Sequence, residues 1–222
     1  MITLAIDTAS QICAVAIVEN GTPLVRVSEN IGKGHAEKLI GQIVAATKES
    51  NISLDRIDRL AVDIGPGSFT GVRIGVATSR GLALALSTVA VGISSLEAIA
   101  FDAHKVFPKN NVVVVIDAGR DMVYRQDFDQ NLAPLNAAQL QSNKDITATI
   151  DKNAVLAGPY AATIGEMLAS HGHEIYAVAA PDIVSFALLA EQKTPDCLPK
   201  PLYLRAADAK QQSSFALPRK KQ

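Results

Sequence analysis

Residues 2–27 read ITLAIDTASQICAVAIVENGTPLVRV, and this stretch decides the fold. It holds three apolar runs of strand length, at Ile2–Ile6, Ile12–Val18 and Pro23–Val27. The links between them are short, and one contains Asn20-Gly21, a dipeptide typical of hairpin turns. Because parallel strands need a long crossover connection, these links predict an antiparallel meander of three strands.

Helices and strands alternate after this meander. Apolar residues spaced three and four apart predict helices, and short apolar runs predict strands. The predicted helices are His35–Ser50, Thr70–Leu86 and Ser94–Ala103, with strands at Leu60–Ile64 and Val89–Gly92. The order βββαβαβα is that of the ribonuclease-H-like unit. The sequence therefore predicts an α/β protein with the actin-like ATPase (ASKHA, ribonuclease-H-like) fold, which uses two such lobes.

The rest of the chain predicts an abbreviated second lobe. Strands are expected at Val112–Ala118, Met122–Asp129, Ala154–Ala157 and Glu174–Val178, and helices at Ala161–Ser170 and Ile183–Glu191. Residues 131–152 are polar and predict no element. We therefore expect an N-terminal lobe over 1–107, a second lobe over 108–205 and a loose basic tail over 206–222.

Composition limits the class of protein. Hydrophobic residues make up 48% of the 222 residues and charged residues 19%, so the chain has enough apolar surface for a packed core. The net charge of −1 does not suggest an autonomous nucleic-acid binder. Two cysteines exclude a disulfide scaffold. With no long apolar run and no basic leader before the first strand, we expect a cytoplasmic protein without a membrane partner.

The glycine-rich loop Gly65–Gly71 reads GPGSFTG and lies between a strand and a helix. The N-terminus of a helix offers unpaired N–H groups to an anion. The loop lacks the Lys-Ser/Thr pair of a Walker loop, and its third glycine is one residue late for a dinucleotide fingerprint. The alternative is a tight turn in which Ser68 or Thr70 caps the helix, and we favour that structural role.

The helix predicted at Thr70–Leu86 is apolar on nearly every side. Its two arginines, Arg73 and Arg80, fall on one stripe. A helix of this kind is seldom exposed, so both of its faces need a cover. The sheet of its own lobe covers one face. The second lobe or another protein chain covers the other, and we favour a partner surface.

Asp7 ends the first strand, with Thr8 and Ser10 after it, and Asp117 ends the strand at Val112–Ile116. Two aspartates on equivalent hairpins that point into one cleft would suit Mg²⁺ and a nucleotide. The alternative is that both residues only begin turns. His35, His104, His171 and His173 show no metal-ligand spacing, and Ser68 has no His/Asp set, so we predict no metal site and no catalytic residues.

Several stretches together resemble one family. They are Ala5–Ala9, Gly65–Gly75 (GPGSFTGVRIG), Gly81–Ala83, Val91–Leu96, Ile116–Ala118 and Pro201–Arg205. They resemble the TsaB (YeaZ) family of glycoprotease-like, M22-type proteins over nearly the whole chain. The resemblance implies a pseudoenzyme, a non-catalytic subunit in the synthesis of N6-threonylcarbamoyladenosine at position 37 of tRNAs that read ANN codons.

The resemblance also implies partners. They are a catalytic TsaD-type subunit, a TsaE-type ATPase, tRNA through the complex, and a second copy of the chain through the same helices. Pairing would use His35–Ser50 and Thr70–Leu86. We expect the partner-binding residues to be His35, Leu39, Ile43, Thr70, Val72, Arg73, Val76 and Arg80.

One departure from the catalytic sister supports the non-catalytic role. The sister carries H-x-x-x-H where this chain reads Ser94-Ser95-Leu96-Glu97-Ala98-Ile99, so the metal ligands are missing. The second lobe also lacks a glycine-rich stretch for adenosine. The resemblance therefore implies no intrinsic cofactor, with ATP or ADP and Mg²⁺ held only in complex with partners. The alternative function is an independent ATP-dependent small-molecule kinase of the actin/sugar-kinase superfamily, and a peptidase is less favoured.

Overall fold

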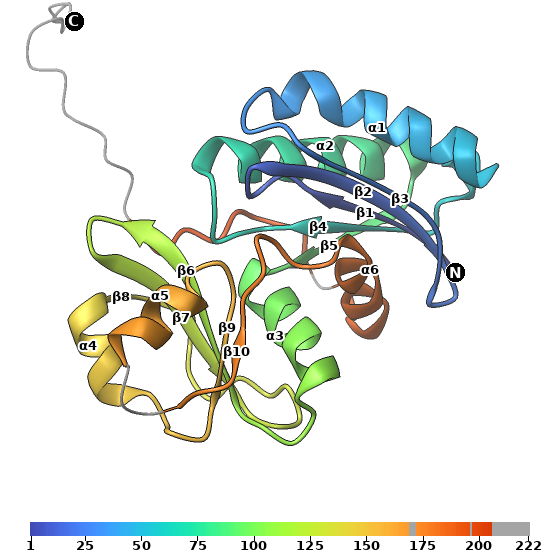
Figure 1. The fold of residues 1–222 in the computed structure, drawn as a ribbon. Coiled ribbons are helices and arrows are strands. Elements are labelled where there is room, and N and C mark those ends of the chain that lie inside the picture. Colours follow the sequence, from blue (N-terminus) through green and yellow to red (C-terminus); the bar gives the residue numbers. More distant parts are fainter. Residues whose placement is uncertain (169–171, 196, 206–222) are drawn as a thin grey trace, which may run out of the picture.

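The computed structural model describes residues 1–168, 172–195 and 197–205, and it forms two lobes (Figure 1). The first lobe has a five-stranded sheet in the order β3-β2-β1-β4-β5. Its strands are β1 (Ile2–Asp7), β2 (Ile12–Glu19), β3 (Thr22–Asn30), β4 (Arg59–Asp63) and β5 (Val89–Ile93). The first three strands pair antiparallel, β4 pairs parallel with β1, and β5 pairs parallel with β4. The predicted meander and the strands that follow it are confirmed.

Helices cover both faces of this sheet. On one face lie α1 (His35–Ser50) and α2 (Phe69–Leu86), and α6 (Ile183–Gln192) lies on the other (Figure 1). A 3₁₀ turn, η1 (Leu54–Arg56), precedes β4. The two faces of the sheet differ in side-chain size. Leu4, Ile6 and Ile17 point toward α1 and α2, whereas Ala5, Ala16 and Ala61 face α6. The alanines allow α6 to pack close to the strands.

The second lobe is smaller. Its sheet has the order β10-β9-β6-β7-β8. The strands are β6 (Val112–Gly119), β7 (Met122–Phe128), β8 (Gln139–Ser142), β9 (Val155–Ala157) and β10 (Ile175–Tyr176), and two short helices, α4 (Asn143–Thr149) and α5 (Ala161–Met167), accompany them. Helix α3 (Ser95–Val106) joins the lobes, because Leu96 and Ile99 pack in one core with Val112 and Val114 of β6. The polar residues 131–152 thus contain β8 and α4.

Helix α6 falls within residues 108–205 but packs on the sheet of the N-terminal lobe. Both of its ends are fixed there. At its N-terminus the backbone N–H of Asp182 donates to Asp102 of α3, and at its C-terminus Arg59 donates to the carbonyls of Ala190 and Lys193. Two hydrogen-bonded ends and an apolar face hold this helix to the first lobe. The position of a helix along the chain therefore does not decide which sheet it covers.

Residues 197–205 form an irregular segment that we call the C-terminal strap. It runs beside α2 toward the end of β6 (Figure 1). The N–H of Leu202 donates to the carbonyl of Ile64 at 2.8 Å, and Arg205 donates to the carbonyl of Ala118 at 2.9 Å. The strap therefore touches both lobes. The predicted basic tail over 206–222 and the end of the helix predicted at Ala161–Ser170 lie outside the described residues.

Among the helices in the described part of the chain, none is long and apolar enough to cross a membrane.

Candidate functional site

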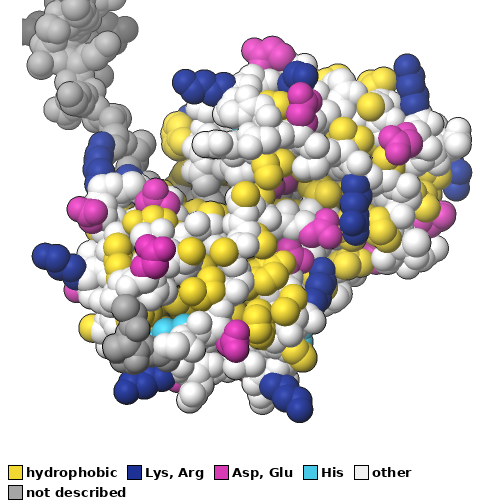
Figure 2. Space-filling model, in the orientation of Figure 1, with side chains coloured by type: hydrophobic (Ala, Val, Ile, Leu, Met, Phe, Trp, Pro, Cys, Tyr) yellow, Lys and Arg dark blue, Asp and Glu magenta, His cyan; other side chains and the backbone are white. Residues whose placement is uncertain are grey.

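A cleft of about 640 Å³ separates the two lobes. Its walls come from the end of β1, the glycine-rich loop after β4, the start of α3 and the end of β6, with residues 179–181 closing one side. The polar residues that line it are Asp7, Ser10, Gln11, Asn30, Asp63, Ser68, Ser95 and Asp117. The cleft thus collects residues at or near the ends of four strands, β1, β3, β4 and β6. Figure 2 shows one face of the molecule, on which hydrophobic side chains lie over both lobes among charged ones.

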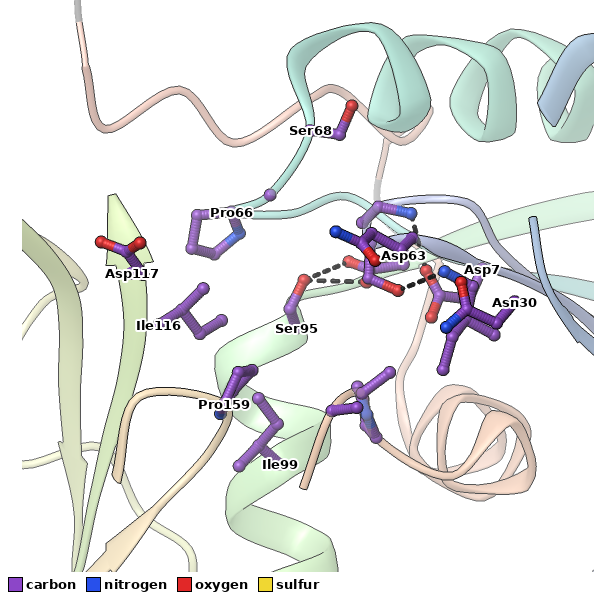
Figure 3. A pocket seen from close by; sticks show the side chains of 18 of the residues that line it. Asp7, Asn30, Asp63, Pro66, Ser68, Ser95, Ile99, Ile116, Asp117 and Pro159 are labelled. Carbon is purple, nitrogen blue, oxygen red and sulfur yellow. Dashed lines mark hydrogen bonds between the residues drawn. The ribbon is translucent and has the colours of Figure 1, made fainter. Parts of the chain in front are cut away.

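Two buried carboxyl groups, Asp7 and Asp63, lie together in this cleft beside Ser95 (Figure 3). Asp7 accepts a hydrogen bond from the N–H of Ala9 at 2.8 Å, and Asp63 accepts one from the N–H of Gly65 at 2.6 Å. The hydroxyl of Ser95 lies 2.8 Å from both oxygens of Asp63. Each carboxyl is therefore held by the turn that follows its own strand.

Burial raises the pKa of Asp7, and it raises the pKa of Asp63 further, with the charge of Asp7 adding to the effect. The two carboxyls share a hydrogen bond. Because like charges this close cannot both ionise without a large cost, one proton is retained by the pair.

Of the other residues predicted to contact a nucleotide, Asp117 and Ser10 line the cleft and Thr8 does not. Asp117 lies across the cleft from the pair, at the end of β6, and accepts the N–H of Gly119 at 2.8 Å (Figure 3). Ser10 lines the cleft and accepts the N–H of Ile12. Thr8 is buried, and its hydroxyl donates to the carbonyl of Gly71 at 2.7 Å, where it fixes the start of α2. The structure thus brings Asp7, Ser10 and Asp117 to one cleft, whereas Thr8 is part of the packing between the turn after β1 and α2.

Asp63 and Ser95 were not among the site residues predicted from the sequence. Asp63 has a detectable signal, because it is an acidic residue near the end of a buried strand, directly before a glycine-rich loop. That is the same context that singled out Asp7. Ser95 follows the residue that caps α3, and only the three-dimensional structure brings it to Asp63.

A magnesium nucleotide, which the fold suggests, does not fit this lining. No lysine, arginine or histidine is among the described residues that line the cleft. A polyphosphate needs such cations or free carboxylates that hold Mg²⁺. Asp7 and Asp63 instead bond to each other and to their own turns, and within the described residues no group of three metal-ligating side chains forms. The predicted nucleotide contacts of Asp7, Thr8, Ser10 and Asp117 have no support from this geometry.

The glycine-rich loop has the structural role that we favoured. Ser68 is the N-cap of α2 and accepts the N–H of Gly71 at 3.2 Å. A Cβ on Gly71 would lie 1.9 Å from the carbonyl oxygen of Thr8, which leaves no space for any other residue. The loop therefore packs directly against the turn after β1.

The structure corrects the predicted centre of the partner surface. Leu39 and Ile43 of α1, and Val72 and Val76 of α2, are all buried between these helices and the sheet of their own lobe. These four side chains have almost no solvent-accessible surface that a second chain could contact. Of the remaining predicted partner-binding residues, His35 is buried and Thr70, Arg73 and Arg80 are exposed.

Other apolar residues of the same helices are exposed. We call them the helix face, and they comprise Ile40, Gly41, Val44 and Ala45 of α1 with Ala77, Gly81, Leu84 and Ala85 of α2. Leu84 is 84% exposed and Ile40 is 54% exposed. Helices α1 and α2 lie on the same side of the sheet, so these residues form one side of the lobe (Figure 1). Large apolar side chains in such a group mark an interaction surface.

Comparison with known proteins gives one family. A family model described as TsaD, tRNA N6-adenosine threonylcarbamoyltransferase, matches residues 27–189. TsaB of Haemophilus influenzae, named a tRNA threonylcarbamoyladenosine biosynthesis protein, is 36% identical over 121 residues, which are 54% of this chain and 51% of that protein. The chain thus spans about half the length of this curated relative.

Two solved structures are similar in fold. A Pseudomonas aeruginosa protein with similarity to the peptidase YeaZ is 26% identical with a TM-score of 0.78, covering 92% of this chain and 99% of that chain. An activator of 2-hydroxyisocaproyl-CoA dehydratase from Clostridium difficile, with bound ADPNP, is 13% identical with a TM-score of 0.54, covering 86% of this chain and 95% of that one. The second likeness concerns the fold alone. The predicted actin-like ATPase fold is confirmed.

Proposed function

The chain belongs to the tRNA N6-adenosine threonylcarbamoyltransferase family, and from that membership we propose that it is a subunit of the machinery that installs N6-threonylcarbamoyladenosine at position 37 of ANN-decoding tRNAs. The observation that carries the proposal is the match to the family model over 27–189, together with the similarity to TsaB. Features of the cleft and of the helix face support the role that we propose within this machinery.

The proposed role is that of a non-catalytic scaffold. The cleft supports it, because its acidic pair is bonded to itself and no cation lines the cleft in the described part of the chain. The helix face supports the scaffold role as well, because burial of its large apolar side chains against a partner would be favourable in free energy. The proposed partner is the TsaD-type catalytic subunit, paired through α1 and α2. A second copy of the chain would compete for the same face.

The remaining partners follow from this role. A TsaE-type ATPase and tRNA would be reached through the complex. We propose that the chain alone binds no ATP or ADP, and that Mg²⁺ and nucleotide are held only where the partners complete a site. Calorimetry of the isolated chain with millimolar Mg²⁺ and ATP tests this, and measurable heat of binding lost in Asp7→Ala would favour the kinase alternative.

Mass spectrometry of tRNA nucleosides tests the function directly. Cells depleted of this protein should lose N6-threonylcarbamoyladenosine and gain unmodified adenosine at position 37. The wild-type chain should restore the modification, whereas Leu84→Asp, which alters the exposed helix face, should restore little of it. Val106→Asp is the matched control, because Val106 is also exposed but lies at the end of α3. An unchanged nucleoside level after depletion would contradict the proposed function.

A further inference from the structure

Arg73 of α2 is held in place by two aromatic side chains. Its guanidinium carbon lies 3.7 Å from the centre of the Phe69 ring and 5.6 Å from that of Tyr203. Its Nε donates to the hydroxyl of Tyr203 at 2.7 Å. The two rings are themselves in contact, with centroids 5.3 Å apart. Phe69 and Tyr203 are nevertheless 46% and 48% exposed, so this cluster lies at the surface.

Tyr203 comes from the C-terminal strap, which follows α2 along its length. Leu198 of the strap borders a hollow beside Leu84 near the C-terminus of α2, while Tyr203 meets Arg73 near its N-terminus. Eleven residues of rise along α2 span ~16 Å, and five residues of chain reach ~17 Å at most, so the strap between Leu198 and Tyr203 is long enough to follow α2 over this distance. The strap therefore extends the helix face on the side of α2.

The free end of Arg73 carries no ion pair among the described residues. Its Nε is occupied by Tyr203, which leaves the two terminal nitrogens for a ligand. Helix α2 has two arginines and no acidic residue, and residues 197–205 add Lys200 and Arg205, again without an acid. A fixed guanidinium in a cationic strip, bordered by apolar side chains, is complementary to a carboxylate in a protein interface.

We propose that Arg73, fixed by Phe69 and Tyr203, donates from its guanidinium to a carboxylate of the catalytic subunit, so that the strap is a third element of the docking surface. This rests on the proposed function. Arg73 would touch the partner, and Tyr203 is a positioning residue. Pairing α2 with α2 of a second copy would bring arginines together, which disfavours self-association as the use of this cluster. The apolar residues Ala77 and Leu84 on the same helix favour a protein over RNA.

Calorimetric titration of the full chain with the TsaD-type subunit, at low and at high salt, tests the inference. Arg73→Gln should weaken binding about tenfold or more at low salt and flatten the salt dependence. Arg73→Lys should recover part of the loss, because charge remains but the planar fork is gone. Tyr203→Phe keeps the ring and removes the hydrogen bond, so a smaller loss is expected. Arg26→Gln is the matched control, since Arg26 pairs with Asp182 on the other face of the sheet.

The outcomes separate the two proposals. If the wild-type chain does not bind the subunit, the proposed function fails and the inference fails with it. If the wild type binds and Arg73→Gln binds equally well, only the inference is overturned. The inference would also be overturned if Arg73→Gln left the affinity for the subunit unchanged but lost tRNA binding or homodimer formation. The cluster would then bind RNA or a second copy of the chain.

Discussion

The proton shared by Asp7 and Asp63 makes the stability of the N-terminal lobe depend on pH. Both carboxyls have a pKa above the ordinary 3.8 in the folded chain, chiefly because they are buried. The folded chain therefore binds more protons than the unfolded chain between that value and the raised values. The contribution of this pair to the free energy of unfolding is fully present below the unfolded pKa. It is lost as pH rises through the folded pKa values.

Asp63→Asn should remove much of this dependence. The amide donates to Asp7 without carrying a charge, and its oxygen still accepts from Ser95. We expect the Tm of the variant to exceed that of the wild type by a few degrees at pH 7.5 and to approach it at pH 4. Thermal unfolding followed by circular dichroism measures both. Asp55→Asn, on the exposed turn η1, is the control. If Asp63→Asn lowers the Tm equally at both pH values, the two carboxyls do not share a proton.

Val76 and Leu84 differ in exposure although both are apolar residues of α2. Val76 is 3% exposed and packs on the sheet, so Val76→Asp buries an unpaired charge and should cost about 3 kcal/mol or more. Leu84→Asp should change the free energy of unfolding by about 0.5 kcal/mol or less. Urea denaturation measures both values. A stable, monomeric Val76→Asp variant would show that this residue is not part of the core.

At the residue scale, the sequence did not predict which way the apolar side chains of α2 face. Arg73 was singled out by its stripe on α2, and it is exposed. Val72 and Val76 were placed at a partner surface and are buried, because a helix that is apolar on every side has no periodicity to show which side meets the sheet.

Helices α1 and α2 each carry an exposed glycine, Gly41 and Gly81. A Cβ at either position would meet nothing within 4 Å, so no packing in the lobe requires glycine there. Gly81→Ala should stabilise the isolated chain by about 1 kcal/mol through helix propensity. It should nevertheless weaken binding to the catalytic subunit, because the added methyl group keeps a partner helix farther away.

Thermal unfolding and a binding titration of the same variant check both effects. Gly71→Ala serves as the contrast, because its Cβ would clash with the carbonyl of Thr8, and it should lower the Tm strongly. If Gly81→Ala binds the subunit as tightly as the wild type does, the helix face is not approached closely at that point.

At the scale of elements, periodicity and length predicted most of the fold. The meander, α1, α2, α3 and the strands of both sheets other than β8 lie within a few residues of their predicted bounds. The pattern failed for β8 and α4, which are short, polar and half-exposed, so that alternation of apolar residues does not mark them. It also failed to assign α6 to a lobe, since hydrophobic periodicity does not identify the sheet that receives a helix.

The whole molecule is divided in space differently from the way it is divided in sequence. Residues 1–107 supply all five strands of the first sheet, but α6 covers one face of that sheet. A fragment of residues 1–107 should therefore leave the alanine-rich face open and remain partly unfolded or aggregate.

Circular dichroism and binding of a hydrophobic dye measure this, with the full chain as the reference. A fragment of residues 1–195 retains α6 and is the matched control, because it loses only the strap and the tail. Cooperative unfolding of the 1–107 fragment at the Tm of the full chain would contradict the role of α6.

The late position of α6 also bears on synthesis at the ribosome. The first lobe closes around Phe186, which is fully buried and lies far downstream of the strands. While the second lobe is being translated, the nascent first lobe presents one uncovered sheet face to solvent. Chaperones that recognise exposed apolar segments would meet this protein at that stage, and slow translation between β6 and α6 would lengthen their opportunity to bind.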